Sequence, residues 1–325
     1  MSAWPISFDD VLRARQRITP HLEPTPLRQY ASLDAAVGAG IHVLVKHENL
    51  NPTGAFKVRN GLSAIGALTL EDKKRGVVTA STGNHGQGVA YAGKLLGVPV
   101  AVCVPMGNNP EKNEAMRGFG AELVEEGKDY DEALEVAQRL VHERGMHLVH
   151  GTNDKDVVAG AATLALEILE QAASLDAMVI AVGGGSQAVG AMTVARRLMP
   201  GLKVYAVQAQ GAAAAHDSWH AKKPVEVPAA DTFAEGLATR KPYEMTLPAL
   251  IEGLTGFVTV SDGELAEAMR ILLRTTHTLV EGAGAAGLAG LLKLRDQLAG
   301  KTVAIILSGA NIDTATLRRV LNGEI

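Results

Sequence analysis

The run Asn49-Leu50-Asn51-Pro52-Thr53-Gly54-Ala55-Phe56-Lys57-Val58-Arg59 lies between a strand-like stretch, His42–Lys46, and a helix-like stretch, Lys57–Leu68. A lysine held in a packed, partly apolar setting loses its preference for the charged form, so its amine can act as a nucleophile or a base. Schiff-base chemistry with a carbonyl cofactor requires such an amine. The ordinary alternative for Lys57 is a solvated helix face, but two glycine-rich loops further along the chain favour the chemical interpretation.

Apolar runs alternate with stretches of helical period along the chain. The expected strands are His42–Lys46, Val77–Ala80, Val98–Val104, Glu122–Val124, Leu148–Val149, Met178–Val182, Lys203–Gln208 and Thr302–Leu307. The expected helices are Phe8–Arg17, Lys57–Leu68, Gln87–Leu96, Pro110–Phe119, Tyr130–Arg144, Asp156–Gln171, Gln187–Leu198, Asp262–Thr276, Gly287–Leu298 and Thr314–Leu321. Continuously apolar strands separated by helices predict an α/β fold, with parallel sheets flanked by helices on both faces. A chain of 325 residues exceeds what one core usually serves, so two lobes are expected.

The first glycine-rich loop, Gly183-Gly184-Gly185-Ser186, follows the apolar run Met178–Val182 and opens a helix. Glycines let several backbone N–H groups converge on one point, and a helix N-terminus favours an anion, so the loop predicts a phosphate site. The same loop also satisfies the G-x-G-x-x-A pattern of dinucleotide sites. Such sites need an acid about 20 residues further on. The segment Val207–Gln210 holds neither an acid nor an arginine, which favours a compact phosphate over NAD.

Two further loops carry polar side chains at the ends of expected strands. Ser81–Gly88 follows Val77–Ala80, and its N–H groups and hydroxyl and amide side chains suit a carboxylate. The ordinary alternative for His85 is a helix-cap histidine. Ser308 follows the apolar run Thr302–Leu307, where its ordinary role would be an N-cap.

The segment Thr53–Arg59 resembles the Schiff-base lysine segment of the fold-type II pyridoxal-phosphate (PLP) enzymes. These include threonine and serine dehydratases, serine racemases, cysteine synthases and the tryptophan synthase β chain. Three other segments resemble this family's cofactor-contacting segments in the same order, namely Ser81–Gly88, Gly183–Ser186 and Ser308–Asn311. The resemblance covers nearly the whole chain. It implies a two-lobed, tryptophan synthase β-like fold, with a small domain at residues 76–151 and a large PLP-binding domain at residues 1–75 and 152–325.

The same resemblance assigns site residues. It implies pyridoxal 5'-phosphate as cofactor and Lys57 as the catalytic Schiff-base residue, with Ser308 facing the pyridine nitrogen. The cofactor would be bound by Phe56, Lys57, Asn84, Gly183, Gly184, Gly185, Ser186, Gln187 and Ser308. The α-carboxylate of the substrate would be bound by Ser81, Thr82, Asn84 and His85.

The implied activity is that of an ammonia-lyase, or dehydratase, acting on a small β-hydroxy amino acid. The first candidates are L-threonine and L-serine, converted to a 2-oxo acid and ammonia by α,β-elimination. Alternatives within the family are a dehydratase for 3-hydroxyaspartate, phenylserine or a hydroxyectoine-derived compound, a serine racemase, and a β-replacing synthase. Asn84-His85 favours the dehydratase and racemase branch, whereas Thr82 stands where racemases carry a serine as second base. An NAD-dependent dehydrogenase and a non-catalytic carrier are alternatives from other classes.

Composition excludes several kinds of partner. The formal net charge of −4 and the lack of a basic stripe argue against nucleic acid, and no apolar run is long enough for a membrane span. The single cysteine, Cys103, lies in an apolar run and cannot form a disulfide within the chain. A reducing compartment, most simply the cytoplasm, is therefore expected. The resemblance implies a homodimer. Some relatives hold a divalent cation through a glutamate and an aspartate where this chain has Gln208 and Ala214, so no metal is expected.

Two histidine groups give no metal site by pattern. His142 and His147 lie five residues apart, a spacing that points helical side chains away from each other. The group His216, Trp219 and His220 is expected in a polar, proline-bearing loop.

Overall fold

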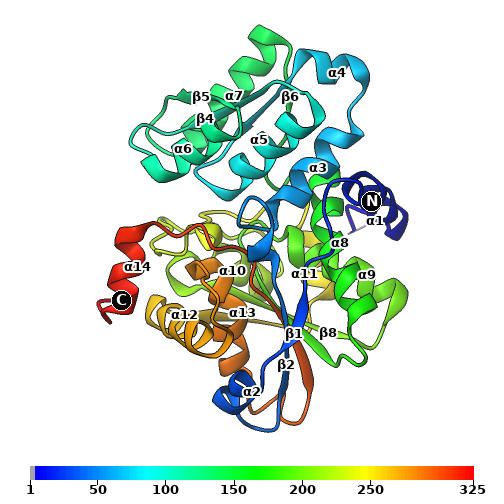
Figure 1. The fold of residues 1–325 in the computed structure, drawn as a ribbon, viewed down its shortest axis with the longest axis vertical. Helices are drawn as coiled ribbons and strands as arrows, with labels where there is room; N and C mark the ends of the chain where they lie inside the picture. The colour runs from blue at the N-terminus through cyan, green and yellow to red at the C-terminus, as the bar shows by residue number, and fades with distance from the viewer. Residues whose placement is uncertain (1–3) are drawn as a thin grey trace.

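The computed structural model describes residues 4–325, which form two lobes, each built around its own sheet (Figure 1). The strands are β1 Leu27–Gln29, β2 His42–Lys46, β3 Val77–Ala80, β4 Val100–Val104, β5 Glu122–Glu125, β6 His147–Leu148, β7 Ala177–Ala181, β8 Lys203–Ala209, β9 Gly256–Val260 and β10 Thr302–Ile306. The helices are α1 Phe8–Ile18, α2 Ala31–Val37, α3 Lys57–Ala67, α4 Leu70–Arg75, α5 Asn84–Leu96, α6 Pro110–Gly118, α7 Tyr130–Arg144, α8 Lys155–Gln171, α9 Ser186–Leu198, α10 Ala214–Ala221, α11 Leu247–Gly253, α12 Asp262–Thr276, α13 Gly282–Lys293 and α14 Thr314–Leu321. Short 3₁₀ turns occur at η1 Glu48–Leu50, η2 Gln210–Ala212 and η3 Glu235–Leu237.

The larger sheet has the strand order β1-β2-β10-β7-β8-β9, and β10 lies between β2 and β7. Side chains alternate along β10, so that Val303 and Ile305 enter one core while Ala304 and Ile306 enter the other. A strand buried on both faces must be apolar throughout, which explains why its sequence does not alternate.

The smaller sheet has the order β5-β4-β3-β6, and all its neighbours pair in parallel. Val77 of β3 packs into the core that holds Val89 of α5, and Val78 packs into the core that holds Val136 of α7. The sheet is therefore covered on both faces, with Cys103 buried inside it. All four strands lie within residues 76–151, while the domain boundaries themselves stay a prediction.

Helix α3, which begins at Lys57, connects the two lobes (Figure 1). Val58 and Leu62 belong to the core of the smaller sheet, although α3 also packs against α8 of the larger lobe. Backbone contact with both neighbours is very close. A Cβ at Gly88 of α5 would lie 2.4 Å from the Lys57 carbonyl oxygen, and one at Gly160 of α8 would lie 2.5 Å from that of Arg59.

The α/β architecture with helix-flanked parallel sheets is confirmed, but several details differ. The edge strand β1 is antiparallel to β2 and was not predicted, and neither were β9, α2, α4, α10 and α11. The helix expected at Gly287–Leu298 begins five residues earlier, at Gly282, and ends at Lys293. Its first turns are rich in glycine and disfavoured by local propensity, so burial between the sheet and its neighbours decides the helix.

The expected loop around His216, Trp219 and His220 is also wrong, because these residues lie on α10. His216 stacks edge-on against Phe257 of β9, with ring centroids 5.5 Å apart. Packing against β9 stabilises helix α10, although its polar sequence does not predict a helix. His142 lies on α7 and His147 on β6, so they do not share a helix.

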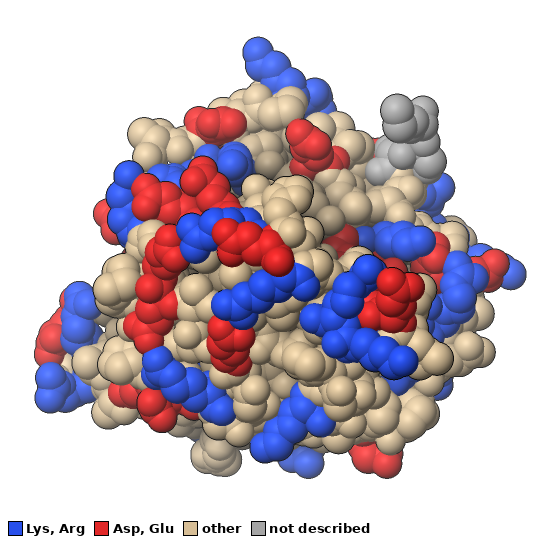
Figure 2. All heavy atoms as spheres, turned by 90° about the horizontal axis from the view of Figure 1, so that it is seen from above, with Lys and Arg blue, Asp and Glu red and all other residues tan. Residues whose placement is uncertain are grey.

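Charged side chains of both signs mix on the face shown in Figure 2, which views the molecule from above, and no continuous area of one sign appears there. Cross-element pairs such as Arg139–Glu126 and Arg144–Glu122 are typical of this mixture. No helix among residues 4–325 is both long and apolar enough to cross a membrane.

Candidate active site

Three neighbouring parallel strands of the larger sheet end at the same edge, and each is followed by one of the sequence motifs. The Lys57 segment follows β2, Ser308 follows β10, and Gly183 follows β7. Loops after the carboxyl ends of adjacent parallel strands lie together, and this is where open α/β sheets bind ligands. The topology therefore brings together three motifs that are far apart in the sequence.

Hydrogen bonds join the Lys57 segment directly to the Ser308 loop. The backbone N–H of Phe56 donates to the Ser308 carbonyl oxygen at 3.0 Å. The backbone N–H of Ala310 donates to the Gly54 carbonyl oxygen at 2.9 Å. Ala55 and Gly309 form an antiparallel bridge between these bonds. The Ser308 hydroxyl, which is buried, donates to the Ala283 carbonyl oxygen at 3.4 Å.

Lys57 occupies the first position of α3 and is partly buried. Its Nζ donates to the Gly151 carbonyl oxygen at 3.2 Å and lies 5.2 Å from the centroid of the Phe56 ring. Burial lowers the pKa of this amine from 10.5 to about 8, because desolvation penalises the ammonium form. Lys57 therefore reaches its neutral, nucleophilic form far more easily than an exposed lysine does.

The loop Gly183–Gly185, which we name the glycine cup after its predicted role, packs so closely on neighbouring segments that side chains would not fit. A Cβ at Gly183 would lie 2.2 Å from the Gly236 carbonyl oxygen, and one at Gly184 would lie 2.0 Å from Thr152 Oγ1. Gly185 has a φ of +94°, which side-chain-bearing residues rarely adopt. The sequence therefore needs glycine at all three positions, and the N-cap of α9, Gly185, makes no side-chain hydrogen bond to the helix.

Two helices at the site begin at glycines, which have no side chain of their own to cap the helix. The N-cap residues of α5 and α9 are Gly83 and Gly185, whereas α7, α8 and α12 are capped by side chains of Asp129, Asp154 and Ser261. A glycine N-cap leaves N–H donors available to an anion, although at α5 the N–H of Gly86 is bound by the Ser81 hydroxyl. At α9, Gln187 Nε2 is buried and has no hydrogen-bond partner within residues 4–325.

The loop at Ser81–Gly88 is held in shape by its own first residue. The Ser81 hydroxyl accepts hydrogen bonds from the N–H groups of Gly86 at 2.9 Å and Gly83 at 3.2 Å. Asn84 Nδ2 donates to Glu281 Oε1 at 2.6 Å, and Asn84 Oδ1 accepts from Asn311 Nδ2 at 2.7 Å. Asn84 is thereby fixed between two residues of the larger lobe, and Thr82 remains partly exposed.

His85 is buried, and its Nε2 contacts the Val149 carbonyl oxygen at 3.3 Å. Desolvation first, and then the nearby charge of Lys57, lower the pKa of His85 to about 3. His85 is thus neutral at ordinary pH. The structure places the predicted residues Lys57, Asn84, Gly183 and Ser308 in one connected site, while the roles of the individual side chains stay predictions.

Sequence reasoning missed the loop His150–Asn153, which connects Lys57 to the glycine cup. Gly151 accepts from Lys57, and Thr152 abuts Gly184. His150 Nδ1 accepts hydrogen bonds from the backbone N–H groups of Thr152 and Asn153, which stabilises the neutral imidazole. Burial also lowers the pKa of His150 to about 4. The available signal was the position of this loop after a strand of a parallel sheet.

Glu281 is a second missed residue. It precedes α13, and the pKa of its carboxyl is raised by burial, with Lys112 and Asn84 acting in the opposite direction. A Cβ at Gly309 would lie 2.5 Å from Glu281 Oε1, so the glycine after Ser308 makes room for this carboxyl. Nothing in the local sequence around Glu281 indicates a site.

Gln208 stands where a metal-binding glutamate was considered. Its Nε2 donates to Thr239 Oγ1 at 3.2 Å, and its Oε1 accepts from the His216 N–H at 2.9 Å. Both ends of the amide are therefore used inside the protein.

Comparison with known proteins agrees with this geometry. The family described as "Pyridoxal-phosphate dependent enzyme" matches residues 18–309. L-threonine ammonia-lyase of Thermotoga maritima is 35% identical over 98% of this chain and 78% of the relative. L-threo-3-hydroxyaspartate ammonia-lyase of Saccharomyces cerevisiae is 33% identical over 98% of this chain and 97% of the relative. The solved structure of maize serine racemase superposes with a TM-score of 0.93 at 30% identity, covering 99% of this chain and 98% of that one.

Proposed function

The chain belongs to the pyridoxal-phosphate dependent enzyme family, and on that basis we propose that it is an ammonia-lyase for a small β-hydroxy amino acid, L-threonine first and L-serine second. The observation that carries this proposal is the partly buried Lys57 amine, with its lowered pKa, beside two helix N-termini that begin at glycine. One N-terminus suits a phosphate and the other a carboxylate, which are the two anionic groups of such a cofactor and substrate. Because the chain belongs to this family, the alternative of an NAD-dependent dehydrogenase is set aside.

The residues present fit pyridoxal phosphate. Gly183–Gln187 would hold the phosphate, since any side chain in the cup would clash and Gln187 Nε2 is an unused donor among the described residues. Lys57 would carry the covalent attachment, Ser308 would face the pyridine nitrogen, and Asn84 would contact the phenolic oxygen. When bound, the cofactor supplies an aldehyde that condenses with amines and a ring that withdraws electrons from the substrate α-carbon.

Groups of the protein itself orient the substrate and transfer the proton. The start of α5, with Ser81 and Thr82, orients the substrate through its α-carboxylate. The free amine of Lys57 takes the α-proton as general base. The β-hydroxyl leaves with a proton as water, and hydrolysis of the released enamine consumes one water and yields a 2-oxo acid and ammonia.

The charge near the carboxylate loop favours threonine over 3-hydroxyaspartate. Lys112 Nζ lies 3.8 Å from the Cβ position of Gly83, and it is paired with Glu235 Oε2 at 2.6 Å. A cation that already has a carboxylate partner is poorly placed to receive the second carboxylate of 3-hydroxyaspartate. A neutral side chain such as that of threonine requires no such partner.

A substrate panel tests the proposal. The purified enzyme with pyridoxal phosphate is given L-threonine, L-serine, threo-3-hydroxyaspartate, phenylserine and a hydroxyectoine-derived substrate, and release of 2-oxo acid is measured. We expect the highest kcat/KM with L-threonine. D-serine formation is followed in the same assay, since solved racemase structures resemble this chain. Racemisation faster than elimination, or a clear preference for 3-hydroxyaspartate, would contradict the proposal.

Ser308→Asp is expected to slow elimination and to increase side reactions such as transamination. A carboxylate would hold the pyridine nitrogen protonated and so prolong the carbanionic stage, whereas a hydroxyl cannot. The measurement is the ratio of 2-oxo acid to aminated cofactor in single-turnover reactions. Ser308→Thr, which keeps the hydroxyl, is the control, and an unchanged product ratio in Ser308→Asp would remove the assigned role.

The rate at which pyridoxal phosphate attaches to the cofactor-free protein should rise with pH and level off above about 8. Only the neutral amine attacks the aldehyde, and burial lowers the pKa of Lys57 to about 8. An ordinary lysine, with a pKa of 10.5, would give a rate that keeps rising beyond pH 9. Absorbance of the attached cofactor, followed between pH 6 and pH 10, separates the two results.

Chelation of divalent cations should leave the activity unchanged. Gln208 is a neutral amide engaged by Thr239 and by the His216 N–H, and Ala214 offers no oxygen on its side chain. Hard cations depend on charged carboxylates for most of their affinity. Activity is measured after exhaustive chelation and again after adding Mg²⁺, Mn²⁺ or Ca²⁺; a several-fold loss that one ion reverses would show that a cation is needed.

A further inference from the structure

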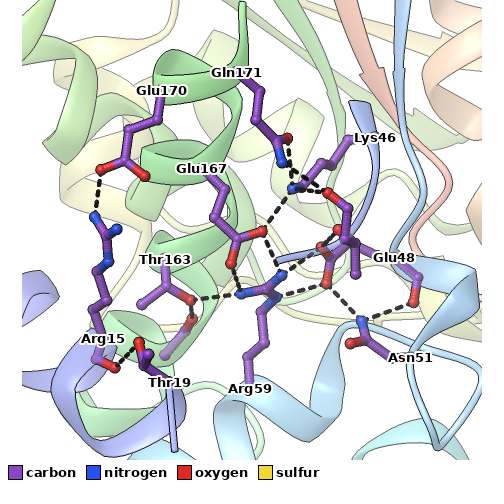
Figure 3. Close-up of polar contacts among 12 residues, drawn as sticks. Arg15, Thr19, Lys46, Glu48, Asn51, Arg59, Thr163, Glu167, Glu170 and Gln171 are labelled. Carbon is purple, nitrogen blue, oxygen red and sulfur yellow. Dashed lines mark hydrogen bonds and ion pairs between the residues drawn. The ribbon is translucent and has the colours of Figure 1, made fainter. Parts of the chain in front are cut away.

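Four charged side chains form a buried group behind the Lys57 segment, which we name the Arg59 cluster: Lys46, Glu48, Arg59 and Glu167 (Figure 3). They come from β2, η1, α3 and α8, respectively. The side chains of Lys46, Glu48 and Arg59 are at most 1% exposed, and that of Glu167 is 12% exposed. With two cations and two anions the cluster is neutral.

Arg59 is bound by both carboxylates in paired fashion. Its Nε and Nη2 donate to Glu48 at 2.7 and 2.9 Å, and its Nη1 and Nη2 donate to Glu167 at 2.6 and 2.8 Å. Nη1 also donates to Thr163 Oγ1 at 3.3 Å, so the five N–H groups of the guanidinium are all engaged. A planar fork held on two sides has little freedom to rotate or slide.

The anions are in turn held by neighbouring groups. Glu48 accepts from Thr25 Oγ1 at 2.6 Å and from Asn51 Nδ2 at 2.8 Å. Lys46 Nζ donates to Glu167 at 2.6 Å and to the Thr25 carbonyl oxygen at 2.7 Å. Opposite charges keep the pKa of Glu48 low despite its burial, so both members of the Arg59–Glu48 pair stay ionised.

The cluster acts on the turn that carries Lys57. Arg59 lies two residues after Lys57 in the first turn of α3, and Glu48 and Asn51 lie in the segment that leads into it. On the same turn, the carbonyl oxygens of Lys57 and Arg59 lie so close to Gly88 and Gly160 that a Cβ at either glycine would clash. The backbone of Lys57 is therefore confined by glycine contacts to α5 and α8 and by the Arg59 side chain.

We propose that the Arg59 cluster is a positioning device that fixes the first turn of α3, so that Lys57 Nζ meets the cofactor aldehyde and the substrate α-proton in one defined geometry. This inference rests on the proposed function, because it concerns the same lysine. Arg59 touches no reacting atom and acts through the backbone that it shares with Lys57. A displacement of about 1 Å at a reacting group can cost roughly 100-fold in rate.

A buried group of ion pairs is weak evidence for a role in fold stability. Replacing a complete buried ion group with apolar side chains of similar volume is often neutral or stabilising, because the desolvation cost of the charges disappears. Removing a single partner is destabilising, because it leaves a buried charge uncompensated. A complete replacement therefore separates a positioning role from a merely structural one.

The first test compares Arg59→Met and Arg59→Lys with wild type in two measurements. One is the rate of attachment of pyridoxal phosphate to the cofactor-free protein, with borohydride reduction and mass spectrometry to identify the lysine modified. The other is the split between kcat and KM for L-threonine. We expect Arg59→Met to lose about 100-fold in both the attachment rate and kcat, with KM changed by less than about threefold. Arg59→Lys should recover only part of the loss, since an ammonium cannot pair with two carboxylates in forked geometry.

The second test uses the complete replacement Lys46→Met, Glu48→Gln, Arg59→Met and Glu167→Met. Thr25 and Asn51 both donate to Glu48, and glutamine at position 48 keeps one acceptor oxygen for them. We expect a thermal midpoint within about 4 °C of wild type, together with slow attachment and low kcat. Arg17→Met is the matched control, because Arg17 pairs with Asp156 of α8 at 2.8 Å and packs against Gly66 at the far end of α3. It should change the attachment rate and kcat by less than twofold.

A complete replacement that folds and attaches the cofactor at the wild-type rate would overturn the proposal, and so would a folded Arg59→Met variant within twofold of wild type. If Arg59→Met does not fold, the attachment rate and kcat of the complete replacement and of Glu167→Gln test the proposal instead. Failure of the proposed function is recognised separately. A wild-type protein that attaches pyridoxal phosphate but releases no 2-oxo acid refutes the assigned reaction, while the attachment rates still test the cluster.

Discussion

Lys57→Ala is expected to lower the turnover of β-hydroxy amino acids by at least about 10³-fold, because one side chain provides both the covalent attachment and the general base. Burial lowers the pKa of the amine to about 8, and within residues 4–325 the amine donates to a single acceptor, the Gly151 carbonyl oxygen. The fold should survive, since the aliphatic chain contributes little to either core. The measurement is kcat for 2-oxo acid release, with the circular dichroism of the variant compared with that of wild type.

Lys94→Ala is the control for this variant, because Lys94 is an exposed lysine on α5 whose Nζ contacts the Gly118 carbonyl oxygen at 3.4 Å. It should keep the wild-type rate. Added methylamine should restore a small part of the activity of Lys57→Ala if the missing group is a base. A folded Lys57→Ala variant with near-normal turnover would show that another residue performs the chemistry.

Gly183→Ala is expected to weaken the affinity for pyridoxal phosphate by about 100-fold. The new Cβ would lie 2.2 Å from the Gly236 carbonyl oxygen, and a backbone atom cannot move aside as a flexible side chain can. The cup must open, and losing two charge-assisted hydrogen bonds to the phosphate at roughly 1.5 kcal/mol each corresponds to about 100-fold in Kd. The Kd is measured by titrating the cofactor-free protein and following absorbance.

Gly201→Ala is the matched control, since Gly201 lies beyond the other end of α9 and its Cβ would meet nothing within 4 Å. It should leave the Kd unchanged. A Gly183→Ala variant with wild-type affinity would mean that the phosphate is bound elsewhere. Thermal unfolding of both variants without cofactor separates loss of the cup from loss of the fold.

The strands and helices were predictable where the local sequence and the burial of both faces agree. Strands β3 and β10 show this, since each is apolar apart from one threonine and is followed by a glycine-containing loop. Prediction failed where the context decides. The helix α13 begins at Gly282 in a run of glycine and alanine that has no start signal of its own, and the short β1 is formed only by pairing with β2.

The same division holds within the site. Lys57, the glycine cup and the Ser81 and Ser308 loops were predicted because each is a contiguous motif with its own chemistry. Glu281, His150 and Gly151 were not, because their significance lies in contacts with residues distant in the sequence: Glu281 with Asn84, and Gly151 with Lys57.

The sequence by itself determined the α/β class and the order of the glycine-rich and polar loops, and it predicted Lys57 as the reactive lysine, because each depends on residues close together in the chain. Only the tertiary structure decided what surrounds that lysine. Parallel pairing of β2, β10 and β7 brings the loops to one edge, and close glycine contacts fix α3 between two helices. Burial of Lys57 lowers its pKa, and packing of α3 against α8 places the buried Arg59 between Glu48 and Glu167. Desolvation depends on packing by distant segments, which no local pattern of residues encodes.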